Sequence, residues 1–198
     1  MTLTDEQRTD LEAMRNAARQ REWTTLQDTF KRLIADLDPL IALSITARQM
    51  QKFLPKFEKA YPEAGWVREL LLTVMSYASA PSPNDLPLAA VNQFPSPGMG
   101  NFILAVFDLA RSVRGEYTVF ERYSHITNAT ANVLLADLQH FYFSRHPEAY
   151  AALHADDTTD EDRAEIQGRF WLDGHVAWRD AATWLEVIDD LDAKLRGA

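Results

Sequence analysis

With 198 residues, of which 46% are apolar, the chain is long enough to fold around one hydrophobic core, because a domain of this size buries about 70% of its unfolded surface. It has no cysteine, which excludes disulfides, zinc sites built on thiolates and thiol nucleophiles. The net charge of −9 disfavours nucleic acid as a partner, and no apolar stretch approaches the roughly 18 residues of a membrane span. Because the N-terminus also lacks the pattern of a secretory signal, we expect a cytoplasmic protein that binds neither nucleic acid nor membrane.

The negative charge is concentrated at one end of the chain. Residues 148–198 contain 13 acidic and 5 basic side chains, whereas residues 1–147 contain 16 acidic and 15 basic ones. We expect this acidic C-terminal third to repel phosphate backbones. It would attract a basic partner, including the basic face of the third helix described below.

Helical periodicity begins at the N-terminus. Thr4 followed by Gln7 is typical of a capping box, and apolar residues then recur on one face up to Ala18. A second helix shows apolar steps of four, three and four. The pair Asp38-Pro39 ends it and begins the next helix, with Asp as the cap and Pro at the first helical position.

The third helix has the clearest apolar face, with basic residues beside it. Its apolar residues alternate in steps of four and three from Leu43 to Tyr61. Pro55 lies inside this pattern and predicts a kink or an early end. The neighbouring face forms a basic stripe that consists of Arg48, Lys52, Lys56 and Lys59. The stripe fits either a solvated face or a surface for an anion or an acidic partner.

A fourth amphipathic helix, residues 67–78, is followed by a long irregular segment. Prolines at positions 81, 83, 87, 95 and 97 predict a loop over residues 81–97. This loop either links two helical halves, residues 1–80 and 98–198, or lies as a strap across a groove. Its apolar residues favour the strap, since a free linker would not need them.

Two further helices follow the loop. Residues 98–101 begin the first. This turn either exposes backbone N–H groups to an anion or is a flexible helix entry, and the missing Lys and Ser/Thr of a phosphate loop favour the flexible entry. Residues 102–107 are apolar on every side, which predicts a helix in the middle of a bundle. The second is a long helix from about Tyr117 to Arg145.

The C-terminal segment is also helical in pattern. A short helix reaches His154, and residues 160–196 form a helix interrupted near residues 173–174. Its aromatic residues line an aromatic pocket or belong to a plain core, and these are Phe170, Trp171, Trp178 and Trp184. Together the patterns predict one all-α domain, residues 1–198, built as a compact bundle or antiparallel array of about seven or eight helices with the long helix at its centre.

The long helix contains an unusual uncharged polar segment. From Tyr123 to Ala136 it has no Asp, Glu, Lys or Arg, although Ser, Thr, Asn and His are mediocre helix formers. Steps of four, three and four place four side chains on one face, the polar stripe, with Tyr123 beside it: Glu121, His125, Asn128 and Asn132. Such groups suit either the wall of a ligand pocket or a polar contact between helices.

Two pairs on the same helix have the spacing for acid/base or metal chemistry. These are Glu121 with His125 and Asp137 with His140. The pairs cannot share a metal, because the two histidines lie 15 residues apart, which is about 22 Å along a helix. The Glu-x-x-His and His-Glu-x-x-His patterns of metalloenzymes are absent, so we predict no metal or cofactor.

The leading functional hypothesis is a binding module without catalysis. It would sense a small ligand at the polar stripe, with the Pro-rich strap covering the site. Alternatively it would bind a protein partner or form a homodimer. One alternative is an enzyme that acts on a small molecule through Glu121/His125 or Asp137/His140. Another is a protein that recognises a charged partner through the basic stripe, residues 48–59, or through the acidic C-terminal third.

Overall fold

The computed structural model describes residues 2–76 and 94–197, and the regular elements in these two ranges are all α-helices. The helices are α1 (Asp5–Gln20), α2 (Trp23–Ile34), α3 (Pro39–Ala60), α4 (Trp66–Ser76), α5 (Met99–Ser112), α6 (Val119–Phe143), α7 (Pro147–Leu153), α8 (Asp160–Leu172) and α9 (Gly174–Gly197). The all-α prediction is confirmed, with nine helices in the described ranges where seven or eight were expected. The predicted interruption near residue 173 divides α8 from α9, because Asp173 accepts hydrogen bonds from the N–H groups of His175 and Val176.

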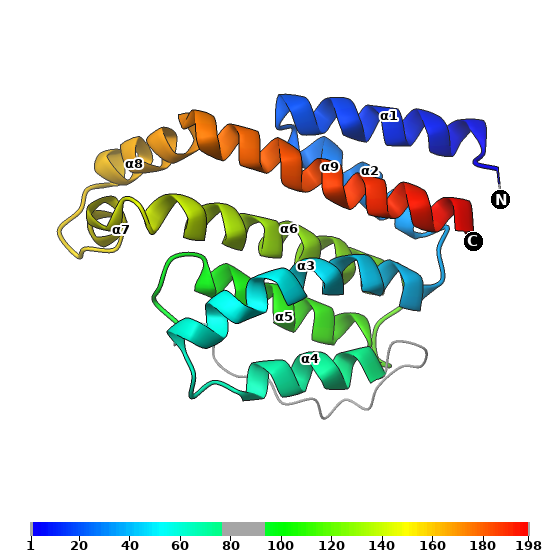
Figure 1. Cartoon of the computed structure of the whole chain (residues 1–198), viewed down its shortest axis with the longest axis horizontal. Coiled ribbons are helices and arrows are strands. Elements are labelled where there is room, and N and C mark those ends of the chain that lie inside the picture. Colours follow the sequence, from blue (N-terminus) through cyan, green and yellow to red (C-terminus); the bar gives the residue numbers. More distant parts are fainter. Residues whose placement is uncertain (1, 77–93, 198) are drawn as a thin grey trace.

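Helix α6 lies at the centre of the bundle. In Figure 1, α1, α3 and α6 run in one direction, and α2, α4, α5 and α9 run in the other. Helix α6 contacts α2, α3, α5, α7 and α9, and its packing against α5 is the most extensive of these. The N-terminal helix α1 packs on the C-terminal helix α9, so the two ends of the described chain close the same side of the bundle.

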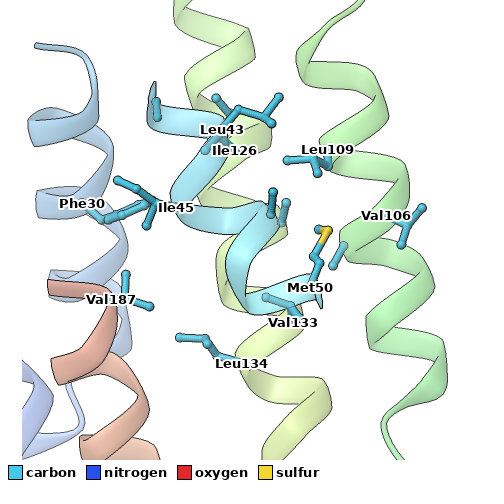
Figure 2. Close-up of a cluster of buried hydrophobic side chains, with 14 of the residues drawn as sticks. Phe30, Leu43, Ile45, Met50, Val106, Leu109, Ile126, Val133, Leu134 and Val187 are labelled. Atoms are coloured by element: carbon cyan, nitrogen blue, oxygen red, sulfur yellow. The ribbon is translucent and has the colours of Figure 1, made fainter. Parts of the chain in front are cut away.

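The main hydrophobic core fills the space between α6 and the helices around it. Figure 2 shows one side chain from each of five helices directed into this space: Phe30 of α2, Ile45 of α3, Leu109 of α5, Ile126 of α6 and Val187 of α9. All five are fully or almost fully buried. Burying such a side chain stabilises the fold by about 1.5–3 kcal/mol. Because the core takes residues from segments 1–80 and 98–198, the two predicted halves share it.

A second, smaller core lies where the C-terminal end of α6 meets α8 and the start of α9. Its buried members are Leu138, Tyr142, Phe143, Phe170 and Val176. The rings of Phe143 and Phe170 stack with their centroids 5.6 Å apart. The short helix α7 has no buried residue of its own and covers this core with partly buried side chains.

The helix starts follow the predicted caps. Thr4 caps α1 in a reciprocal capping box with Gln7, and Asp38 caps α3 ahead of Pro39. A further capping box begins α6, where Thr118 accepts from the N–H of Glu121. Each such cap satisfies backbone N–H groups that the first turn leaves without partners.

Helix α3 does not end early at Pro55, in contrast to one of the two predicted outcomes. It continues to Ala60, and both Leu54 and Phe57 are buried in the main core. A proline inside a helix costs about 3 kcal/mol. Burial of the apolar face on both sides of Pro55 offsets this cost, so packing decides where the helix ends.

Much of the predicted Pro-rich loop, residues 81–93, lies outside the described residues. Its end, residues 94–97, is described, and Phe94 packs in an edge-on contact on Tyr61 and on Phe57. Within the described ranges, no helix combines the length and the apolar character needed to cross a membrane.

Gly98 sets the close approach of α5 to α6. Its φ of 78° lies in the left-handed region, and a Cβ placed there would be 2.2 Å from the carbonyl oxygen of Ala136. Two residues on, Gly100 has ordinary helical geometry, and a Cβ there would meet no atom within 4 Å.

These two glycines make a matched pair for a stability test. We expect Gly98→Ala to lower the free energy of unfolding by at least about 1–3 kcal/mol, because the left-handed backbone becomes strained and the methyl group collides with α6. We expect Gly100→Ala to raise it by about 0.5–1 kcal/mol, as alanine does within a helix. Urea unfolding curves of both variants measure the difference. Equal midpoints would show that Gly98 does not fix the α5–α6 packing.

Candidate functional site

The polar stripe of α6 is directed in part toward a carboxylate that the sequence did not single out. Asp108 of α5 is only 9% exposed. One of its carboxylate oxygens lies 3.1 Å from Nδ1 of His125, and the other lies 3.5 Å from the amide nitrogen of Asn132. Arg111, one turn further along α5, lies 3.4 Å from the same carboxylate. Two of the four stripe residues therefore form a polar contact between α5 and α6.

The other predicted site residues have different surroundings. Glu121 accepts hydrogen bonds from the N–H and the hydroxyl of Thr118, and these bonds lower its pKa. Asn128 is exposed to solvent. Tyr123 is buried, and its hydroxyl donates a hydrogen bond to the carbonyl oxygen of Leu37 at 2.8 Å. The structure thus brings together His125 and Asn132 but not Glu121, Asn128 or Tyr123.

The threonines beside the stripe explain more of the uncharged segment. The hydroxyls of Thr130 in α6 and Thr46 in α3 are buried and lie 2.7 Å apart. Thr127 donates to the carbonyl of Tyr123 within α6. Polar side chains of this segment therefore connect α6 to α3 as well as to α5, which is the expected behaviour of buried hydrogen-bonding groups.

Asp137 and His140 also have different surroundings. Asp137 forms ion pairs with Lys56 of α3 and Arg179 of α9. Burial raises the pKa of this carboxyl, but the hydrogen bonds from Arg179 and Lys56 lower it by more. The net effect is a lowered pKa, so the carboxylate is held ionised. Burial and the charge of Lys56 lower the pKa of His140, whose Nδ1 is buried without a partner. Within the described ranges, no three His, Asp or Glu side chains gather as metal ligands.

The basic stripe of α3 faces acidic residues of the same chain. Arg48 pairs with Asp190 of α9 at 3.3 Å, and Lys52 pairs with Glu186 one turn earlier in α9. Together with the Lys56–Asp137 pair, these contacts give three of the four stripe residues an acidic partner within the fold. The attraction predicted between the acidic C-terminal third and the basic face is therefore present inside the molecule.

A buried carboxylate lies under the tryptophans of the C-terminal segment. Asp180 of α9 is 1% exposed and accepts hydrogen bonds from the indole of Trp23 at 3.1 Å and from Arg21 at 3.3 Å. Its other oxygen has no partner, and neither does the indole N–H of Trp184. The Trp23 ring lies edge-on to Trp171 and to Trp184. Of the four predicted aromatic residues, Trp184 is thus buried beside a polar centre that helical periodicity did not reveal, and Phe170 belongs to the second core. Trp178 is 72% exposed and belongs to neither hydrophobic core.

A cavity of about 540 Å³ opens at the junction of the two hydrophobic cores, and we call it the junction cavity. It lies between the end of the Pro-rich segment, the start of α5, the end of α6, and helices α7 and α8. Its apolar walls are Phe94, Phe143, Tyr150 and Leu153. Its polar lining includes Ser96, Asn101, Gln139, His154, Arg163 and Gln167.

Hydrogen bonds hold the rim of the junction cavity in place. The amide of Asn101 donates to Gln139 at 2.6 Å, which joins α5 to α6. The hydroxyl of Tyr61, the residue after α3, forms hydrogen bonds with the hydroxyl and the N–H of Ser96, which fixes the described end of the Pro-rich segment. Arg163 donates to two backbone carbonyls at the end of α7. A cavity with a fixed rim and mixed polar and aromatic walls is typical of a preformed ligand site.

No protein-family model matches the chain, and neither a curated protein nor a solved structure matches it.

We expect Asp108→Ala to lower the free energy of unfolding by about 1–3 kcal/mol, because it leaves His125 and Asn132 without their shared acceptor. Asn128→Ala on the same stripe is the matched control. We expect it to change stability by less than about 0.5 kcal/mol, since this side chain is exposed. Urea unfolding of both variants provides the measurement. Similar losses in both would mean that the α5–α6 polar contact contributes nothing specific.

Asp180 provides a test of pH dependence. Burial raises the pKa of this carboxyl, and the hydrogen bonds from Trp23 and Arg21 offset the rise only in part. A raised carboxyl pKa in the folded state means that the stability it contributes is present at low pH and is lost as the pH rises through that value. Asp180→Asn does not titrate. We therefore expect its stability relative to the wild type to increase between about pH 4 and about pH 7.

The free energy of unfolding of the wild type and of Asp180→Asn, measured across that pH range, tests this expectation. A difference that stays constant, or that falls with rising pH, would show that the buried carboxyl is not destabilised by its surroundings.

Proposed function

We propose that the protein is a binding module for a small amphipathic molecule, and that the junction cavity is its ligand site. The observation that carries this proposal is the combination of size and lining. The cavity volume of about 540 Å³ lies within the range of roughly 300–1,000 Å³ that ligand pockets occupy. Aromatic side chains form one part of the wall, and hydrogen-bonding side chains form another. Such a lining supports a ligand with an apolar, preferably aromatic, body and one polar end.

The polar side of the cavity favours a ligand with acceptor oxygens. Arg163 brings a positive charge to the wall, and its ion-pair partner Asp160, at 3.5 Å, is fully exposed to solvent, which screens the pair. The cavity also borders the first turn of α5, where the capping residue Gly98 supplies no side-chain acceptor. Backbone N–H groups in a first turn favour negative charge. An anionic or strongly polar head group would therefore lie toward α5 and Arg163, with the apolar body against Phe143 and Tyr150.

The proposal keeps the leading class of the sequence-based hypothesis and changes its location. The Pro-rich segment was expected to cover a groove beside the polar stripe. Its described end instead lines a cavity at the opposite end of α6, next to Gln139 and Phe143. That the polar stripe itself binds a ligand stays a prediction, as does catalysis through either of the predicted acid/base pairs.

Gly100 allows the cavity to be filled without disturbing the fold. It lines the cavity, and a side chain added there meets no atom within 4 Å of its Cβ. Gly168 in α8 is the matched control, because its Cβ position is equally open but it does not line the cavity. The probe is anilinonaphthalene sulfonate, which joins an aromatic body to an anionic group and becomes fluorescent when bound.

We expect the wild type and Gly168→Leu to bind the probe with the same affinity, and Gly100→Leu to bind it at least about tenfold more weakly, because the leucine occupies the site. Native mass spectrometry of gently purified protein adds a second measurement. Any extra mass carried by the wild type should be absent from Gly100→Leu and retained by Gly168→Leu. Equal binding by the two variants in both measurements would reject the junction cavity as the ligand site.

A further inference from the structure

A second and smaller cavity lies on another side of α6, where α3 and α9 face it. Its volume is about 150 Å³, several times the space that one water molecule needs. Phe53 of α3 and Val133 and Leu134 of α6 contribute apolar surface to it. Figure 2 shows Leu134 extending from α6 toward α9. No residue of this cavity lines the junction cavity.

Charged side chains surround the cavity, and cations outnumber carboxylates. Lys52, Lys56 and Arg179 carry positive charge, whereas Asp137 and Glu186 carry negative charge. Asp137 is paired with both Lys56 and Arg179, so its charge is already compensated. The remaining pair, Lys52 with Glu186, is close to half exposed on both sides and forms the outer rim. An ammonium group has three N–H donors, so each lysine keeps donor capacity beyond its ion pair.

The strongest indication of a ligand is Gln49. This side chain of α3 lines the cavity and is only 4% exposed. Its amide nitrogen is buried and has no hydrogen-bond partner. A buried donor without an acceptor costs about 1–3 kcal/mol of stability. A ligand oxygen in the cavity would satisfy it.

We propose that this cavity binds a short organic carboxylate, with Gln49 and Lys52 as the donors that hold its oxygens. The excess of N–H donors selects a ligand that only accepts hydrogen bonds. The net positive charge of the lining selects an anion. The apolar surface from Phe53, Val133 and Leu134 favours a short carbon chain over a bare inorganic oxyanion. The proposal concerns a site separate from the junction cavity and does not depend on the proposed function.

The test is a titration of the isotope-labelled full chain with sodium butyrate at constant ionic strength. Binding is followed by nuclear magnetic resonance through the side-chain amide signals of Gln49 and the backbone amide of Thr183, which also lines the cavity. We expect saturable shifts of both signals. Sodium chloride alone and the uncharged butyramide should produce neither.

Three variants separate this site from general attraction to a basic surface. Gln49→Leu removes the unpaired donor at nearly constant volume, so we expect an unfolding midpoint at or above that of the wild type. We also expect butyrate affinity, read from Thr183, to fall at least about tenfold. Lys52→Met should weaken binding by roughly threefold to tenfold. Lys59→Met is the matched control, because it lies on the same basic stripe but does not line the cavity, and it should leave the affinity unchanged.

Each contrary result overturns the proposal. Equal effects of Lys52→Met and Lys59→Met would show that butyrate responds only to the general charge of α3. Unchanged affinity in Gln49→Leu would remove the buried amide from the site. Inorganic phosphate that binds more tightly than butyrate would assign the cavity to a bare oxyanion, and butyramide that binds as tightly would remove the need for charge.

Discussion

The enclosure of α6 is the constraint on which the rest of the structure depends. This helix contacts α2, α3, α5, α7 and α9, and most residues of its middle turns are buried or half-buried, with Asn128 as the exposed exception. An unpaired charge there would cost far more than a hydrogen bond returns. The segment from Tyr123 to Ala136 accordingly carries no charged residue, and its hydroxyls bond to neighbouring helices or to its own backbone. The first charged residue after this segment is Asp137, where the helix reaches the edge of the main core and two cations compensate the charge.

The uneven charge of the sequence also follows from the arrangement of helices. Acidic residues of α9 face basic residues of α1 and α3, as in the contacts of Arg15 with Asp192 and of Arg48 with Asp190. Exposed pairs of this kind contribute little stability one by one. Their regular spacing along α3 and α9 still specifies which helix faces which, because another pairing would place like charges together. The part of the acidic bias that α9 carries is thus matched by basic residues of α1 and α3 within the fold.

The helices could be predicted from the sequence, whereas most of the site could not. Apolar steps of three and four, together with caps such as Thr4 and Asp38, determine local structure over a few residues, and these features lie where they were expected. The partner of His125 depends on which helix packs beside α6. Asp108 lies in a helix that is almost wholly buried, and nothing in its local sequence marks it as the acceptor. The two cavities depend on contacts between helices distant in sequence, which periodicity does not encode.

The position of the junction cavity has a structural cause. Helix α6 passes from the main core into the second core. Helices α3 and α5 contribute to the main core, α7 and α8 contribute to the second core, and α9 contributes to both. Helix α7, which covers the cavity on one side, has only seven residues and none of them is buried. Its attachment rests on partly buried contacts of Tyr150 and Leu153 and on the hydrogen bonds that Arg163 donates to its end. Local opening requires the least free energy where few apolar contacts are lost. Helix α7 is therefore the element whose opening would admit the ligand proposed for this cavity without any change in α6 or in the main core.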